Sequence, residues 1–332
     1  MVKARWIFWV LVAAFIWLMV SRQTEIQKVT GPLIRGQLEW VLVAALLQVL
    51  YYIVFAAMFK SAFFTVDVKS RVRDLLSVTL DALFVNVVAP TWGMAGAALY
   101  VDDAAHRGES PARVAAGTLL AQTADLVAFA IILAGGIAYL LMRHRLRGYE
   151  ITGTVVLLII TCSLAGSLLL GIWRPMLLME LLDSVQRGAN GLAKRVHKDV
   201  LLHDGWAAKS ASDFSRAAKA IEEHPERLAF TLGIAMVAHL INIASLYSLF
   251  LAFHQTIGLG PLVAGYAMGI LFWNVSPVPQ GIGVVEGVMA LVYASLGIHR
   301  TMAVLVVLAF RGLNFWLPML VGFFLLRKVR FY

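Results

Sequence analysis

Apolar residues fall into long, continuous runs along most of this chain. A helix that crosses a membrane needs about 20 consecutive, mostly apolar residues. Six runs meet or approach that length, and each predicts a full span. They cover residues 2–20, 40–59, 114–142, 151–173, 228–253 and 302–326. The pattern predicts an all-α polytopic membrane protein, in which the run at 2–20 is an uncleaved first helix.

Two further apolar regions are interrupted. Residues 75–101 are broken at 89–93, and residues 262–296 are broken at 276–283. Freed backbone groups at membrane depth are tolerated only against protein or a wet cavity. Each region is therefore either one kinked span or a re-entrant hairpin of two half-helices, and the hairpin is favoured more strongly for the second. The expected loop residues are Pro90, Gly93, Pro277, Pro279, Gly281 and Gly283.

The two interrupted regions resemble each other. The sequence FVNV at 84–87 matches FWNV at 272–275, and proline and then glycine follow each of them. Asn86 and Asn274 are 188 residues apart. The next span in each half carries a polar pair at nearly the same offset: Gln122 with Asp125, and Arg311 with Asn314.

These matches predict two repeats within a single transmembrane domain of residues 1–332, the first over about 38–142 and the second over about 228–326. An odd number of predicted crossings separates the repeats, so their topology is inverted. Proline- or glycine-broken segments in corresponding halves indicate a binding site at the repeat interface. The alternative is two kinked helices of similar composition.

A polar stretch at about 174–227 separates the two repeats. Within it, residues 177–200 place apolar side chains at helical spacing among basic ones, which is typical of a helix lying on a membrane surface. The distribution of lysine and arginine predicts that this stretch and both termini are cytoplasmic, in the inner membrane. The loop at 143–147 opposes that orientation, because its arginines would then lie outside.

The composition agrees with a membrane protein. Apolar residues make up 61% and charged residues 14% of the 332 residues, and the mean hydropathy is +0.81. The net charge of +9 comes from basic residues at the ends of apolar runs, so it favours anionic headgroups over nucleic acid. The single cysteine, Cys162, cannot form an internal disulfide, and we expect it to be a small buried residue.

Several polar side chains fall inside predicted membrane segments, where they usually face the bundle interior and often serve function. Arg311 lies too deep in its span to reach the surface easily. A guanidinium grips a phosphate or carboxylate with two hydrogen bonds. One hypothesis is that Arg311 receives a lipid phosphate and pairs with Glu286 when empty; a permanent structural ion pair is the alternative. The deep polar residues are Asp81, Asn86, Gln122, Asp125, His239, Asn242, Asn274, Glu286, Arg311 and Asn314.

Signs of an enzyme are few. The chain contains no GxxxxGK[ST], GxSxG or HExxH sequence, which argues against an ATP-driven pump or a hydrolase. Asp102, Asp103 and His106 are of metal-binding type, but they are expected in a solvated polar loop. We therefore predict no cofactor and no metal site.

Two segments resemble a known family. The sequence PQGIGVVE at 279–286, followed by RGLNFWLP at 311–318 and by Gly322, resembles the lysylphosphatidylglycerol synthase transmembrane family, also called flippase-like. The stretch from Pro90 to Asp125 looks like the first-half motif of that family. The chain departs from the family pattern at Gln280, where glycine is common, and at Ala121-Gln122, where Glu-Arg is common.

The resemblance implies movement of a lipid between leaflets. Candidate substrates are an anionic phospholipid of the aminoacyl-phosphatidylglycerol kind and a polyprenyl-linked lipid. Arg311, Glu286, Asn314, Asn274, Asn86, Gln122 and Asp125 are the predicted substrate-binding residues. Two other functions remain open: a membrane-embedded transferase, and a non-transporting partner of a separately encoded lipid-modifying enzyme. The sequence does not indicate an oligomeric state.

Overall fold

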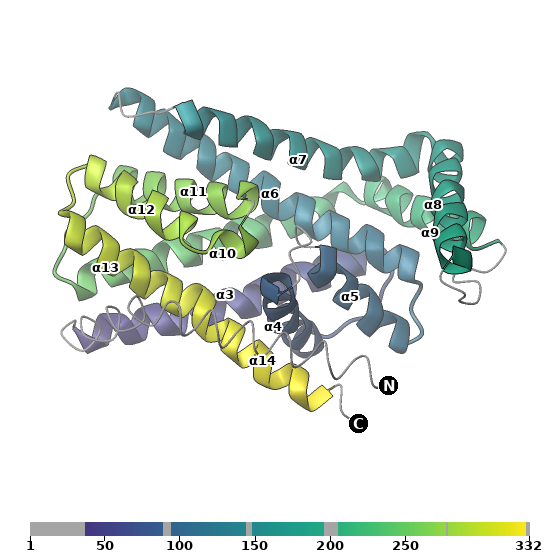
Figure 1. The fold of residues 1–332 in the computed structure, drawn as a ribbon, viewed down its shortest axis with the longest axis horizontal. Helices are drawn as coiled ribbons and strands as arrows, with labels where there is room; N and C mark the ends of the chain where they lie inside the picture. Colours follow the sequence, from purple (N-terminus) through teal and green to yellow (C-terminus); the bar gives the residue numbers. More distant parts are fainter. Residues whose placement is uncertain (1–36, 89–93, 144–147, 196–204, 277, 330–332) are drawn as a thin grey trace.

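The computed structural model describes residues 37–88, 94–143, 148–195, 205–276 and 278–329, and these form a bundle of α-helices (Figure 1). Its elements are α3 (Leu38–Thr65), α4 (Val72–Val88), α5 (Met94–His106), α6 (Pro111–Met142), α7 (Gly148–Trp173), α8 (Pro175–Arg195), α9 (Trp206–Glu223), α10 (Pro225–Ala252), α11 (Leu259–Val275), the 3-10 turn η1 (Pro279–Gly281), α12 (Val284–Ser295), α13 (Arg300–Arg311), the π-helical turn η2 (Gly312–Trp316) and α14 (Leu317–Val329).

Four helices in the described ranges are long and apolar enough to cross a membrane: α3, α6, α10 and the stretch Arg300–Phe324. They correspond to four of the six predicted spans. The predicted span at 151–173 lies within α7, whose apolar part is Glu150–Ser163. The predicted span at 2–20 lies outside the described residues. Cys162 is exposed on α7, so the expected burial of this residue was wrong.

Proline begins several of these helices. Pro111 starts α6, Pro175 starts α8 and Pro225 starts α10. The first helical position suits proline, because the N–H of that residue would have no helical acceptor anyway. Pro175 also ends α7 two residues earlier, since proline disfavours helical backbone in the residue before it. The long apolar run of α7 is thereby separated from the amphipathic α8.

Both interrupted regions consist of two helices that pack against each other. α4 packs on α5, and α11 packs on α12. The loops partly fall outside the described residues, which exclude Pro90, Gly93 and Pro277. The sequence left a kinked span open for the first region, but each pair of arms lies side by side, as in a helical hairpin.

Packing between the two halves of the chain is reciprocal. The most extensive helix pair joins α3 to α10, the first long helix of each half. The first hairpin arm α4 packs against α14 at the end of the second half, and the first arm of the second hairpin, α11, packs against α6 at the end of the first half. Small residues allow these approaches: a Cβ at Gly322 of α14 would collide with the carbonyl of Leu80 in α4.

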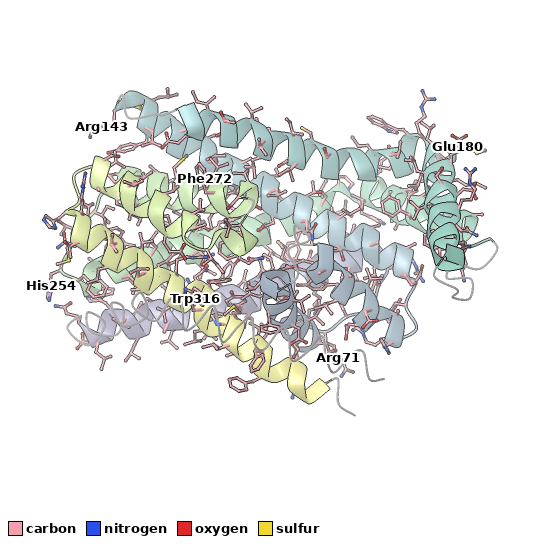
Figure 2. The ribbon with its side chains drawn as sticks, in the orientation of Figure 1. Arg71, Arg143, Glu180, His254, Phe272 and Trp316 are labelled. Atoms are coloured by element: carbon pink, nitrogen blue, oxygen red, sulfur yellow. The ribbon has the colours of Figure 1, made fainter. Side chains whose placement is uncertain are left out.

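The polar stretch between the halves forms a pair of helices at one end of the bundle. α8 packs on α9, and α9 packs on α6 and α7. Figure 1 shows α8 running across the ends of the long helices. In Figure 2, Glu180 of α8 lies at one end of the molecule, whereas Arg143 and His254 lie at the other. α8 keeps Leu177, Leu181 and other apolar side chains exposed.

Replacing Gly136 with alanine should weaken the contact between α6 and α11. A Cβ at this position would lie 2.9 Å from the Cβ of Ala267 and 3.3 Å from the Cα of Ala264. We expect the free energy of unfolding to fall by about 1–3 kcal/mol, as for other overpacked sites. The neighbouring Gly135 has open space around it, so Gly135→Ala is the control and should instead gain up to about 1 kcal/mol of helix propensity. Thermal unfolding in detergent, followed by tryptophan fluorescence, measures both; equal midpoints would contradict the prediction.

Candidate functional site

A cavity of about 450 Å³ lies among the helices of both halves. Its described lining comes from α3, α4, α5, α6, α7 and α11, and from the segment that follows α11. Asp125, on its wall, is the fifteenth of the 32 residues of α6, so the cavity lies about halfway along that helix. Its volume is in the range of pockets that bind small molecules, about 300–1,000 Å³.

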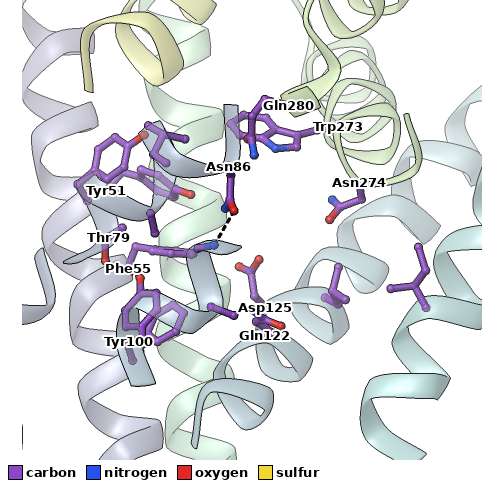
Figure 3. A pocket seen from close by; sticks show the side chains of 18 of the residues that line it. Tyr51, Phe55, Thr79, Asn86, Tyr100, Gln122, Asp125, Trp273, Asn274 and Gln280 are labelled. Atoms are coloured by element: carbon purple, nitrogen blue, oxygen red, sulfur yellow. Dashed lines mark hydrogen bonds between the residues drawn. The ribbon is translucent and has the colours of Figure 1, made fainter. Parts of the chain in front are cut away.

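Four of the predicted site residues line this cavity: Asn86 of α4, Gln122 and Asp125 of α6, and Asn274 of α11. Figure 3 shows the polar ends of Asn86, Asp125 and Asn274 facing the same space. No lysine or arginine is among the described residues of the lining. The carboxyl group of Asp125 is therefore the main charge on the cavity wall.

The two repeat-related asparagines make different contacts. Asn86 accepts a hydrogen bond from the backbone N–H of Gly96, with Oδ1 and N 2.8 Å apart, and so joins α4 to the first turn of α5. A side chain at Gly96 would collide with Asn86. Asn274 donates to the carbonyl of Ile270 in its own helix, 2.9 Å away. The two asparagines of the sequence match thus differ: Asn86 joins the two helices of its hairpin, whereas the hydrogen bond that Asn274 donates stays within α11.

One side of the cavity is aromatic, and the sequence did not single it out. Phe59 of α3 and Tyr100 of α5 stack with their ring planes 3° apart and their centroids 4.3 Å apart. The hydroxyl of Tyr100 lies 2.8 Å from that of Thr79. Tyr51 and Trp273 add further aromatic surface. The signal for such a wall in the sequence is a tyrosine inside an apolar run. A buried tyrosine hydroxyl needs a hydrogen-bond partner, so it indicates other polar groups nearby.

Arg311 lies behind the cavity wall rather than on it. Its side chain is 1% exposed, and it is not among the described lining residues. The guanidinium sits over the rings of Trp273 and Phe315, at 4.8 and 4.3 Å from their centroids. Its Nη2 donates to the carbonyl of Gln280, 3.1 Å away. Trp273 and Gln280 both line the cavity, so they separate Arg311 from it.

Glu286 holds Arg311 and the loop before α12 together. Its Oε1 accepts from Arg311 Nε at 2.7 Å, and its Oε2 accepts from the backbone N–H of Gly283 at 2.7 Å. The predicted pair of Arg311 and Glu286 is therefore formed in the structure. Gln280, Gly281 and Gly283 all have positive φ, which glycine adopts freely and glutamine does not. The contact to Arg311 compensates the strain at Gln280.

Asn314, another predicted site residue, belongs to a buried amide network. Its Nδ2 lies 3.1 Å from Oε1 of Gln48 and 3.0 Å from Oδ1 of Asn242. Gln48 Nε2 donates to the same Asn242 oxygen at 2.9 Å. The network joins α3, α10 and η2, and Asn314 is 2% exposed. In the sequence, Gln48 is a lone amide inside an apolar run, which is typical of a hydrogen bond to another helix.

Tyr52 and Pro318 explain the π-helical turn inside the last span. Pro318 has no N–H to donate to the carbonyl of Asn314, four residues earlier. The hydroxyl of Tyr52 donates to that carbonyl at 2.7 Å. A backbone group freed at membrane depth is thus satisfied by a neighbouring helix. The sequence predicted 302–326 as one span, which the continuous stretch Arg300–Phe324 confirms, but it did not foresee the π-helical turn within that span.

The candidate metal ligands of the sequence do not gather into a site. Asp103 pairs with Arg107, the residue that follows α5, with Oδ2 and Nη2 2.6 Å apart. His106 contacts the carbonyl of Asp102, within α5. Over the part of the chain that the structure describes, no group of three or more histidine, cysteine, aspartate or glutamate side chains is arranged to hold a metal.

Apolar helices around a polar cavity define a multi-pass membrane protein. The chain matches the model of the family described as the lysylphosphatidylglycerol synthase TM region over residues 6–322, and it belongs to that family. It is also 20% identical over 313 residues to a UPF0104 membrane protein of Pyrococcus horikoshii, covering 92% of this chain and 91% of that protein. Membership supports a function related to membrane lipids.

Proposed function

We propose that the protein moves a lipid between the leaflets of the cytoplasmic membrane, with the headgroup passing through the cavity. The observation that carries this proposal is the cavity itself: about 450 Å³, lined by amide, carboxyl and aromatic side chains, halfway along α6 and walled by both broken hairpins. That volume suits a headgroup rather than a whole lipid, so the acyl or prenyl chains would remain in the bilayer. Polar side chains at this depth are costly and usually serve function.

The inverted repeat is the architectural part of the proposal. The first repeat comprises α3 to α6, and the second comprises α10 to α14. Three features support it: the central pairing of α3 with α10, the reciprocal pairing of each first hairpin arm with the last helix of the other half, and the sequence match at Asn86 and Asn274. Inverted repeats commonly carry their substrate site where the broken helices meet.

Helix length supports re-entrant hairpins. α5 has 13 residues and α12 has 12, which makes each about 18–20 Å long at 1.5 Å per residue. The hydrocarbon core is about 30 Å thick. These arms are too short to cross it, so each hairpin would enter the membrane and return to the same side. With the other helices, this gives the proposed six full spans.

The headgroup would contact the polar wall first. Asn86, Gln122 and Asn274 offer amides, and Asp125 offers a carboxylate. An aminoacyl-phosphatidylglycerol headgroup carries an ammonium group that suits Asp125 and a phosphate that suits Arg311. A polyprenyl-linked headgroup, the other candidate, would use the amides and the aromatic side of the cavity.

Arg311 and Glu286 would control the loop between cavity and guanidinium. In the observed arrangement Arg311 is held by Glu286 and by the carbonyl of Gln280. If this loop swings away, Arg311 becomes accessible to a phosphate from the cavity. The proposed orientation keeps both termini and α8 on the cytoplasmic side, where the exposed apolar face of α8 would lie in the membrane surface.

Filling the cavity tests the proposal. Ala97 of α5 lines the cavity, whereas the next residue, Ala98, is exposed on the outside of the same helix. We expect Ala97→Phe to abolish lipid movement and Ala98→Phe to retain it. The measurement is translocation of labelled lipids in proteoliposomes, with a panel of phospholipids, including aminoacyl-phosphatidylglycerol, and a polyprenyl phosphate. Unfolding midpoints show whether both variants are folded.

The substrate panel separates the outcomes. Movement of one lipid class, lost in Ala97→Phe alone, supports translocation and names the class. If the wild type moves no lipid of the panel although it is folded, or if Ala97→Phe moves lipid as fast as the wild type, the cavity is not a translocation path.

A further inference from the structure

A buried histidine contacts Asp125 on the side away from the cavity. His239 of α10 places Nε2 at 3.3 Å from Oδ1 of Asp125 and at 3.4 Å from the backbone oxygen of Asp125. The Asp125 side chain is 30% exposed and the His239 side chain 6% exposed. The carboxylate therefore meets the cavity, and the imidazole lies in the protein beyond it. His239 is the fifteenth of the 28 residues of α10, so the pair lies midway along both helices.

A tyrosine completes the arrangement. Nδ1 of His239 lies 2.8 Å from the hydroxyl oxygen of Tyr266 in α11. In a neutral imidazole one nitrogen donates and the other accepts. With Tyr266 donating to Nδ1, Nε2–H donates toward Asp125. When His239 takes a second proton, Nδ1–H donates to the Tyr266 oxygen instead. Both nitrogens of His239 therefore have a hydrogen-bond partner in either protonation state.

Among the groups around this pair, only His239 can compensate the charge of Asp125 within the described part of the chain. From α3, Tyr51 faces Asp125, and from α11, Tyr266 does so; both are neutral phenols at ordinary pH. From α12, Tyr293 lies beyond Tyr266. Arg311, the arginine buried among the described residues, is already paired with Glu286. Among the described residues, His239 is the basic group within ion-pair distance of Asp125.

We propose that Asp125 and His239 together form a proton-binding site, and that its proton is the coupling ion of the transporter. One proton leaves a hydronium ion in the cavity and binds to the pair, whose charge rises from −1 to 0; the same proton returns to water on the other side. An unpaired charge at the bilayer centre is energetically costly. Neutralising the pair, either by a proton or by a cationic headgroup, removes that cost when the cavity changes sides.

This inference rests on the proposed lipid translocation for its coupling step, but the proton site itself is testable without a lipid. Infrared difference spectra of the protein in lipid nanodiscs, between about pH 5 and about pH 8, report protonation of histidine and carboxyl groups. We expect a buried signal that is lost in His239→Asn and changed in Asp125→Asn. His254→Asn, an exposed histidine after the same helix, should lose only a solvent-exposed signal.

Transport then tests the coupling. In proteoliposomes carrying the lipid panel of the preceding section, a pH gradient should accelerate lipid movement by the wild type and by His254→Asn, but not by His239→Asn. A wild-type spectrum without a signal that His239→Asn removes would overturn the proton site. Lipid movement that ignores the pH gradient would overturn the coupling and leave translocation intact. If the spectral signal is present but no lipid moves, the result supports the proton site and contradicts the proposed function.

Discussion

Replacing Arg311 with glutamine is expected to abolish lipid movement and to lower the free energy of unfolding by about 3–5 kcal/mol. The variant leaves Glu286 as an uncompensated charge at membrane depth, and it removes the donor that contacts the Gln280 carbonyl. It also removes the cation stacked between Trp273 and Phe315. The loop before α12 loses the contact that holds Gln280 at its positive φ.

The matched control is Arg300→Gln, the same change at the exposed first residue of α13. It should leave both stability and transport near wild type. The double variant Arg311→Gln, Glu286→Gln should recover part of the stability, because no buried charge then lacks a partner. Thermal unfolding in detergent and translocation in proteoliposomes measure the two effects. Normal transport by a folded Arg311→Gln variant would show that Arg311 does not bind the substrate. An unfolding midpoint equal to that of the wild type would show that the pair of Arg311 and Glu286 does not stabilise the fold.

Replacing Asn242 with leucine should lower the free energy of unfolding by about 2–6 kcal/mol, the sum expected when one N–H of Gln48 and one of Asn314 lose their acceptor. Its Oδ1 accepts from both Gln48 and Asn314, at 2.9 and 3.0 Å. These bonds join α3, α10 and the π-helical turn, so their loss should also loosen the contact between the two halves of the chain.

Ser248→Ala is the control for Asn242→Leu. Ser248 is buried on the same helix, but its hydroxyl only donates to the carbonyl of Ala244 in that helix, 2.9 Å away. Its removal leaves no group unsatisfied and should change stability by less than about 1 kcal/mol. Unfolding midpoints in one detergent compare the two variants. If Asn242→Leu is as stable as Ser248→Ala, the amide network contributes little to the association of the halves.

The positions of helices were largely predictable from the sequence. Apolar runs at 40–59 and 114–142 lie within α3 and α6, and the run at 228–253 ends one residue after α10, because a membrane helix must satisfy its backbone internally over about 20 residues. The break at 276–283 was predictable for the complementary reason, since its prolines and glycines cannot continue a helix. The π-helical turn at 312–316 was not predictable, because it depends on Pro318 together with Tyr52, which satisfies the freed carbonyl of Asn314 from another helix.

The candidate site was predictable only in part. The sequence named Asn86, Gln122, Asp125 and Asn274, and these line one cavity. It also named Arg311, to which it gave the main role, and Asn314, but neither is among the described lining residues. His239 was listed among the deep polar residues, but its position against Asp125 was not foreseen. Depth in the membrane is a property of position along one helix, whereas access to a cavity depends on which way that helix is turned.

By itself, the sequence determined which segments are apolar helices, where two of them break and which polar groups lie at membrane depth. These follow from run length, proline, glycine and the cost of burying charge. Only the tertiary structure decided which polar groups share a space: Asp125 with His239, Arg311 with Glu286, and Asn314 with Gln48 and Asn242. The physical reason is that helices apolar on every side carry no amphipathic pattern to orient them. Their rotation is set by close contacts between small residues and by hydrogen bonds between helices, such as Gly136 against Ala267.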